Sequence, residues 1–207
     1  MPLGRFLLFL PPDGLVAQLN RASDYGSEGY RFESYRGHYP GEENSSPVFY
    51  MKIKLWSVGK AHETYVKAGV ELFIQRIGHY FPAEWKLISS PKNTSALSSN
   101  QSKKNEGESI LQLLQAGDVL VVLDEKGKQL SSIQLADYIV QKANESSKNI
   151  IFLIGGAYGL DEKILKRADL QWSLSKLVFP HQLVRLILAE QIYRACTITR
   201  NEKYHHC

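Results

Sequence analysis

Short apolar runs alternate with amphipathic stretches along residues 51–207, and this alternation restricts the fold more than any other feature of the chain. The runs are rich in β-branched and aromatic residues, which favour strands. They lie at 52–58, 85–89, 118–123, 149–154 and 170–175. Patterns with helical periodicity lie at 62–79, 105–116, 131–143, 161–167 and 181–198. Strands separated by helices predict an α/β fold, with a mostly parallel sheet and helices on both faces.

The residues at the ends of two expected helices suit the unpaired backbone groups there. Ser131 or Ser132 can cap the helix at 131–143, because a hydroxyl accepts a hydrogen bond from a free backbone N–H. Gly117 is expected to cap the carboxyl end of the helix at 105–116. The polar, basic residues 90–104 are expected to form a mobile loop before that helix.

Met51 opens this pattern, and the residues before it differ in composition. Residues 1–50 hold four arginines and no lysine against six acidic residues, and residues 20–47 show neither strand nor helix periodicity. Such a segment cannot bury enough apolar surface to offset the entropy lost on ordering. We therefore expect residues 1–50 to be a disordered or non-native extension, with an RNA-binding arm as the alternative. Residues 51–207 are expected to form a single domain.

The overall composition is that of a soluble globular protein, with 43% hydrophobic and 22% charged residues. No apolar run approaches the roughly 18 residues of a membrane span, and the short run at 6–10 ends at two prolines without a clear cleavage site. The two cysteines, Cys196 and Cys207, have no metal-ligand spacing. We expect a cytoplasmic protein with no membrane partner and no metal. Residues 51–207 hold 21 basic against 15 acidic residues, which favours an anionic partner such as nucleic acid.

Three turns follow expected strands and are predicted to meet at one edge of the sheet, where parallel α/β folds bind ligands. They are the segments 123–128, 154–159 and 173–182. The second turn reads IGGAYG, which matches neither a dinucleotide-binding nor a P-loop glycine pattern. The third turn, SLSKLVFPHQ, carries apolar residues through a loop. A flat ligand with polar edges, such as adenine, would suit both turns, whereas a tight turn with a purely structural role is the alternative for the glycines.

The expected final helix is apolar around nearly its whole circumference, so it must be buried on several sides. A domain of this size rarely encloses a helix so completely, and a homodimer interface is the economical explanation. His181 and Arg185 share one face of this helix, and Glu190 and Arg194 share another. These polar residues are either surface pairs or a catalytic or RNA-contacting row.

Three segments together resemble the RlmH-type family of ribosomal RNA large-subunit methyltransferases, in the SPOUT class. They are FLIGGAYGL, LSKLVFPHQLVRLILAEQIYRA and the ending YHH, and the similarity extends from Met51 to the tail. The resemblance implies a small homodimer whose carboxyl-terminal half is tied in a trefoil knot. It also implies methylation of N3 of a pseudouridine in 23S rRNA on the assembled ribosome, with S-adenosylmethionine as the methyl donor.

The same resemblance assigns the cofactor contacts by position. They are Leu123, Gly155, Gly156, Leu174, Ser175, Lys176, Leu177, Val178 and Phe179. Tyr204 and His205 in the tail are the candidates for substrate positioning, and His181 and Arg185 are the candidates beside the cofactor. N3 of a pseudouridine must lose its proton before it attacks a methyl group, and histidine is the usual proton acceptor near neutral pH.

Two other functions fit the same residues. One is a non-catalytic RNA-binding or ribosome-associated factor that kept the fold and lost the cofactor, although the intact glycines and apolar loop argue against it. The other is a tRNA methyltransferase of the same fold. Failure to bind S-adenosylmethionine would favour the non-catalytic factor. Methylation of free tRNA, and not of ribosomes, would favour the tRNA methyltransferase.

Removal of residues 1–50 should leave both folding and activity intact, because the domain pattern begins at Met51. Thermal unfolding and methyl transfer can be compared between the full chain and a protein that starts at Met51. A large loss of either property in the shorter protein would contradict the expected domain boundary.

Overall fold

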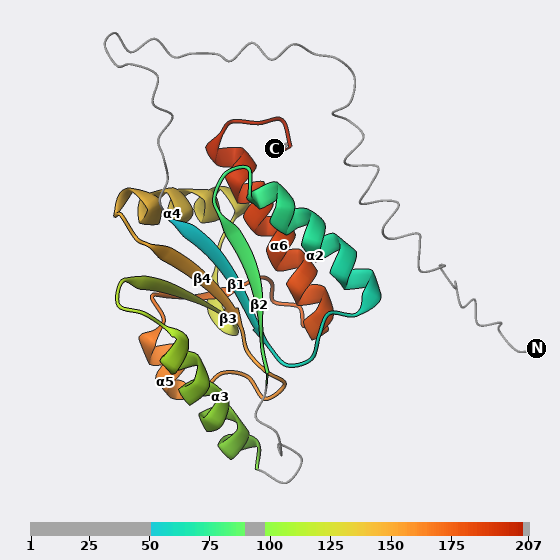
Figure 1. Cartoon of the computed structure of the whole chain (residues 1–207), viewed down its shortest axis with the longest axis vertical. Helices are drawn as coiled ribbons and strands as arrows, with labels where there is room; N and C mark the ends of the chain where they lie inside the picture. The colour runs from blue at the N-terminus through green and yellow to red at the C-terminus, as the bar shows by residue number, and fades with distance from the viewer. Residues whose placement is uncertain (1–50, 90–97, 205–207) are drawn as a thin grey trace, which may run out of the picture. The chain divides into compact units, whose positions relative to one another are not determined.

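The structure is a computed structural model that describes residues 51–89 and 98–204 (Figure 1). The predictions for residues 1–50 and for His205 lie outside this range, as does part of the loop expected at 90–104. The described strands are β1 (Lys52–Val58), β2 (Ala83–Ile88), β3 (Asp118–Gln129), β4 (Asn149–Ile154) and β5 (Leu170–Ser173). The described helices are α2 (Thr64–Ile77), α3 (Ser99–Leu113), α4 (Ser132–Asn144), α5 (Glu162–Arg167) and α6 (His181–Thr199).

The strands form one sheet in the order β2-β1-β4-β3-β5, and every neighbouring pair is parallel. The predicted α/β fold with a mostly parallel sheet is therefore confirmed. Strand β4 lies at the centre, and all six of its residues are buried. Its register pairs Ile150 with both Ile53 of β1 and Val119 of β3. Because all strands run the same way, their carboxyl ends lie together at one edge.

Helices cover both faces of the sheet, with α2, α4 and α6 on one face and α3 and α5 on the other (Figure 1). Alternate residues of β4 join the two cores, since Ile150 and Phe152 belong to the larger and Ile151 and Leu153 to the smaller. This is the period-2 alternation of a strand that is buried on both sides. Within the described residues, no helix is long and apolar enough to span a membrane.

Helix α6 is enclosed largely by its own chain. It packs between α2 and α4 against the sheet, and its central residues Leu188, Ala189 and Ile192 are fully buried. Leu183 and Ile187 remain only half-buried. The apolar circumference of this helix is therefore explained mostly within one chain, and it gives less support to a homodimer than the sequence pattern suggests.

Local signals at the helix ends were partly correct. Ser131 caps α4 in a capping box, with its hydroxyl accepting from the Gln134 N–H at 3.2 Å. The predictions for α3 were wrong at both ends. This helix begins at Ser99, capped by the Ser98 hydroxyl, and it ends at Leu113 with Leu114 as its C-cap. Gly117 lies instead in the turn before β3, with a φ of 85°. The amino-terminal half of α3 is polar, so apolar periodicity did not show where the helix starts.

Strand β3 continues through the segment expected to be only a turn, as far as Gln129. Its pairing with β5 shifts register between Leu123 and Lys128, so the residues between them bulge from the ladder. Gly127 lies in this bulge against the backbone of β5. A Cβ on Gly127 would stand 2.7 Å from the carbonyl oxygen of Gln171 and from the backbone nitrogen of Trp172. The bulge therefore requires glycine for lack of space.

Replacement of Gly127 by alanine should destabilise the fold by about 1–3 kcal/mol, because the atoms that the new methyl group meets are backbone atoms that cannot turn away. Chemical denaturation measures the loss. Gly117→Ala is the matched control, since a Cβ there meets nothing within 4 Å and tests only the cost of a positive φ. Unchanged stability of Gly127→Ala would contradict the close approach.

Candidate functional site

A cleft with a volume of about 630 Å³ lies at the carboxyl ends of β3, β4 and β5. Its walls are the three turns that the sequence predicted to meet at one edge of the sheet. They contribute residues 123–126, 154–160 and 171–179, and the start of α6 adds His181 and Val184. All nine residues that the resemblance assigned to the cofactor line this one cleft. Their contact with a cofactor stays a prediction.

The glycine turn after β4 is packed tightly from behind by its own chain. A Cβ on Gly155 would lie 2.9 Å from the Leu160 side chain, and a Cβ on Gly156 would lie 2.5 Å from a carboxylate oxygen of Glu106. The Gly159 N–H closes the turn by donating to the Gly156 carbonyl at 3.0 Å, with Gly159 at a φ of 81°. Because Gly155 and Gly156 have no side chains, Leu160 and Glu106 pack directly against the backbone that lines the cleft.

The apolar loop after β5 forms the opposite wall. The Ser173 hydroxyl donates to the Ser175 carbonyl at 2.9 Å, and the Ser175 hydroxyl accepts from the Leu177 N–H at 2.9 Å. These bonds hold the backbone, yet the side chains of Leu177 and Val178 are 71% and 86% exposed. Two large apolar side chains exposed beside a cleft indicate a surface that binds a ligand or a partner.

Charged side chains of both signs surround the mouth of the cleft. Asp124 and Glu125 follow β3, and Asp124 accepts a hydrogen bond from the Lys126 N–H at 2.9 Å. Lys103 from α3 and Lys176 from the apolar loop also line the cleft. In the described parts of the chain, no group of three or more His, Cys, Asp or Glu residues could hold a metal ion.

His181 and Arg185 lie one helical turn apart on α6, but of these two only His181 lines the cleft. Arg185 is 3% exposed, and its guanidinium donates to the Lys60 carbonyl at 2.9 Å. It also lies 3.4 Å from the Nδ1 atom of His62. Burial and then the charge of Arg185 lower the pKa of His62. Arg185 thus ties the loop after β1 to α6 and is not among the residues that line the cleft, and its role beside the cofactor stays a prediction.

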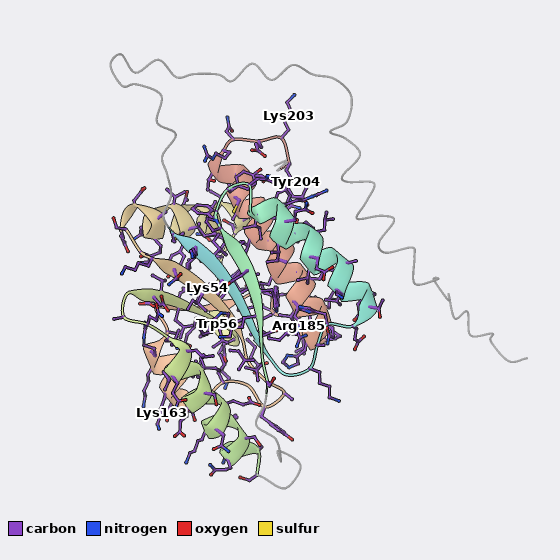
Figure 2. The ribbon with its side chains drawn as sticks, in the orientation of Figure 1. Lys54, Trp56, Lys163, Arg185, Lys203 and Tyr204 are labelled. Atoms are coloured by element: carbon purple, nitrogen blue, oxygen red, sulfur yellow. The ribbon has the colours of Figure 1, made fainter. Side chains whose placement is uncertain are left out.

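Tyr204 lies near the opposite end of α6 from the cleft, as the labels of Arg185 and Tyr204 in Figure 2 show. Its hydroxyl donates to Glu190 at 3.2 Å, and its ring lies 4.8 Å from both the Tyr193 ring and the Arg194 guanidinium. Burial, followed by the charge of Glu190, raises the pKa of Tyr204 to about 12. Glu190 lies nine residues after His181, roughly 14 Å along α6, and Tyr204 is not among the residues that line the cleft of its own chain.

Two polar side chains of structural importance were not predicted from the sequence, namely the buried Glu106 and the half-buried His62. Glu106 packs behind Gly156, and His62 contacts Arg185. A signal for Glu106 was present, because Ser102, Glu106 and Ile110 repeat at helical spacing and Ile110 is an apolar anchor. A carboxylate on the apolar side of a helix needs an explanation. His62 had no comparable signal, since its loop has no periodicity.

Comparison with known proteins gives consistent matches to the domain after Met51. A family model described as "Predicted SPOUT methyltransferase" matches residues 51–205. "Ribosomal RNA large subunit methyltransferase H" of Cytophaga hutchinsonii is 47% identical over 156 residues, which is 75% of this chain and 100% of that protein. Proteins with the same name from Christiangramia forsetii and Lactococcus lactis are 46% and 42% identical. Each of these alignments covers 75% of this chain and 99% of the relative.

Replacement of Arg185 by methionine should raise the pKa of His62, because it removes a nearby positive charge that disfavours the imidazolium. It should also destabilise the fold by about 1–3 kcal/mol through the lost hydrogen bonds of a charged group. NMR titration of the His62 ring measures the first effect. Lys67→Met is the control, since Lys67 is exposed and contributes least to the lowered pKa. A His62 pKa that is unchanged in Arg185→Met would contradict the pairing.

Proposed function

Because the chain belongs to the SPOUT methyltransferase family, we propose that it transfers the methyl group of S-adenosylmethionine to N3 of a pseudouridine in 23S rRNA, on the assembled ribosome in the cytoplasm. Residues 51–207 form the domain that acts. Relatives that share 42–47% of their residues with this chain carry the name of a large-subunit rRNA methyltransferase. The structural observation that carries the proposal is the cleft that the glycine turn and the apolar loop line together.

The cleft suits the proposed methyl donor in size and in chemistry. A volume of about 630 Å³ lies within the range of pockets that bind small organic ligands. Gly155 and Gly156 are buried and present backbone instead of side chains, while Leu177 and Val178 offer apolar surface for an adenine ring. With Leu123, Leu174 and Phe179, these residues hold the cofactor. S-adenosylmethionine supplies a sulfonium methyl group that is open to attack by a nucleophile.

The residues of the chain then position the nucleophile and accept its proton. His181 lines the cleft at the start of α6, which makes it the described histidine best placed to take the N3 proton. Arg185 holds the loop after β1 against α6 and so fixes the position of the helix that carries His181. Orientation of the two reacting groups supplies much of the acceleration in a reaction of this kind.

A homodimer is part of the proposal, in which the tail residues Tyr204 and His205 position the substrate at the cleft of a second copy. Tyr204 packs beside the carboxyl-terminal half of α6, where it contacts Glu190, Tyr193 and Arg194. Tyr204 does not line the cleft of its own chain. The trefoil knot implied by the family resemblance stays a prediction.

The RNA is expected to approach across the mouth of the cleft, where Lys103, Lys126 and Lys176 can contact phosphates. These lysines come from three different elements and stand around the same opening. Contacts of this kind position a substrate without reading its sequence. Selection of one nucleotide would then depend on the shape of the ribosome around it.

The first test is calorimetric titration of the protein with S-adenosylmethionine, where a dissociation constant in the micromolar range corresponds to roughly −8 kcal/mol. Leu177→Asp should weaken binding about tenfold or more, since it removes apolar contact from an exposed loop without disturbing the core. Ile133→Asp changes an exposed apolar residue of α4, outside the cleft, and serves as the control.

Ribosomes that lack the methyl group provide the second test, with mass spectrometry of the rRNA to locate the modified base. Methylation of the ribosomal pseudouridine supports the proposed substrate, and methylation of free tRNA alone would overturn it. Absence of any binding of S-adenosylmethionine would overturn the assignment of the cleft.

A further inference from the structure

Glu106 is a buried carboxylate that lies directly behind the glycine turn of the cleft. It belongs to α3 and is 7% exposed. A Cβ on Gly156 would stand 2.5 Å from one of its carboxylate oxygens and 3.1 Å from the other. Gly156 lines the cleft, whereas Glu106 does not. A single glycine therefore separates this carboxylate from the space where a ligand would bind.

The next residue of α3 fixes this arrangement. A Cβ on Gly107 would stand 2.8 Å from the Cβ of Asp161, the residue that caps α5 just after the glycine turn. Helix α3 thus approaches the segment 156–161 closely at residues 106 and 107. Gly156 of the turn makes room for Glu106, and Gly107 of the helix makes room for Asp161. The side chain of Glu106 has little freedom to move away from the turn, because buried side chains are confined by their neighbours.

The position of Glu106 makes its charge effective inside the cleft. Of the charged residues that line the cleft, Glu125, Lys126 and Lys176 are exposed and Asp124 and Lys103 are half-buried, so water and salt screen them more than they screen Glu106. A buried carboxylate acts on a nearby charge through a medium of lower dielectric constant, where the same separation gives a larger energy. Glu106 should therefore affect a charged ligand at Gly156 more than the exposed residues at the rim do.

We propose that Glu106 is a specificity-determining residue that makes the cleft prefer a cationic sulfonium cofactor over the neutral thioether left after methyl transfer. This inference rests on the proposed function. When the methyl group leaves, the sulfur of S-adenosylmethionine loses its positive charge and becomes the thioether of S-adenosylhomocysteine. The attraction of the sulfur to Glu106 is lost in the same step. The carboxylate therefore favours binding of the methyl donor and release of the spent cofactor.

The test is to measure the dissociation constants of both S-adenosylmethionine and S-adenosylhomocysteine by calorimetry, with the full chain and with Glu106→Gln. The substitution keeps the shape of the side chain and removes its charge. Binding of S-adenosylmethionine should weaken about tenfold, with little change for S-adenosylhomocysteine, as expected for one charge acting across one backbone segment. Glu106→Asp keeps the charge and should retain most of the preference.

Glu108→Gln is the matched control, because it makes the same chemical change two residues later on α3. Glu108 is exposed and pairs with Lys163 at 3.5 Å. This variant should leave the ratio of the two dissociation constants as it is in the unchanged chain. Thermal unfolding of each variant verifies the fold, and a ratio of two constants does not depend on the fraction of active protein.

Equal weakening of both ligands in Glu106→Gln, or no change in either, would assign Glu106 a packing role and overturn the inference while the proposed function stands. Failure of the unchanged chain to bind S-adenosylmethionine would overturn the proposed function and this inference together. A selective loss for the cationic ligand, absent from Glu108→Gln, would establish it.

Discussion

The burial of β4 on both faces is the constraint on which the rest of the domain depends. Its six residues are enclosed, and its backbone is paired in parallel with β1 on one side and β3 on the other. A parallel strand in that position needs helices above and below it, since its side chains have no contact with water on either face. The crossovers that join parallel strands supply those helices. They also place the ends of three strands side by side, and the cleft is the consequence.

The turns that line the cleft need glycine because side chains there would collide with neighbouring parts of the protein. Gly127 lets the bulge of β3 lie on the backbone of β5, and Gly155 and Gly156 let Leu160 and Glu106 pack behind the turn after β4. At each of these positions a methyl group would meet protein atoms. The backbone of Gly155 and Gly156 therefore lines the cleft directly, and the Glu106 side chain of α3 lies immediately behind it.

Helix α6 connects the two ends of the functional surface. Its first residue, His181, lines the cleft, while Arg185 and Gln182 bind the loop after β1 to the same end of the helix. Further along the helix, Glu190 and Arg194 form an ion pair; Glu190 accepts from the Tyr204 hydroxyl and the Arg194 guanidinium lies over the Tyr204 ring. Polar residues of the same helix thus make contacts in two separate regions, of which only the region of His181 lines the cleft.

The sequence alone determined the order of strands and helices along the chain and the α/β class, because period-2 and helical patterns reflect the faces that each segment must bury, whereas the strand order β2-β1-β4-β3-β5 came from the tertiary structure. It also determined which turns meet, since the carboxyl ends of parallel strands share one edge. The start of α3 was missed, because a polar helix that is held by a Ser98 cap leaves no apolar period. The places of Arg185 and Tyr204 relative to the cleft were likewise outside its reach. Only the tertiary structure decided these, together with the contact of Glu106 and Gly156, because they depend on distances between residues far apart in the chain. Spacing along one helix or strand does not contain those distances.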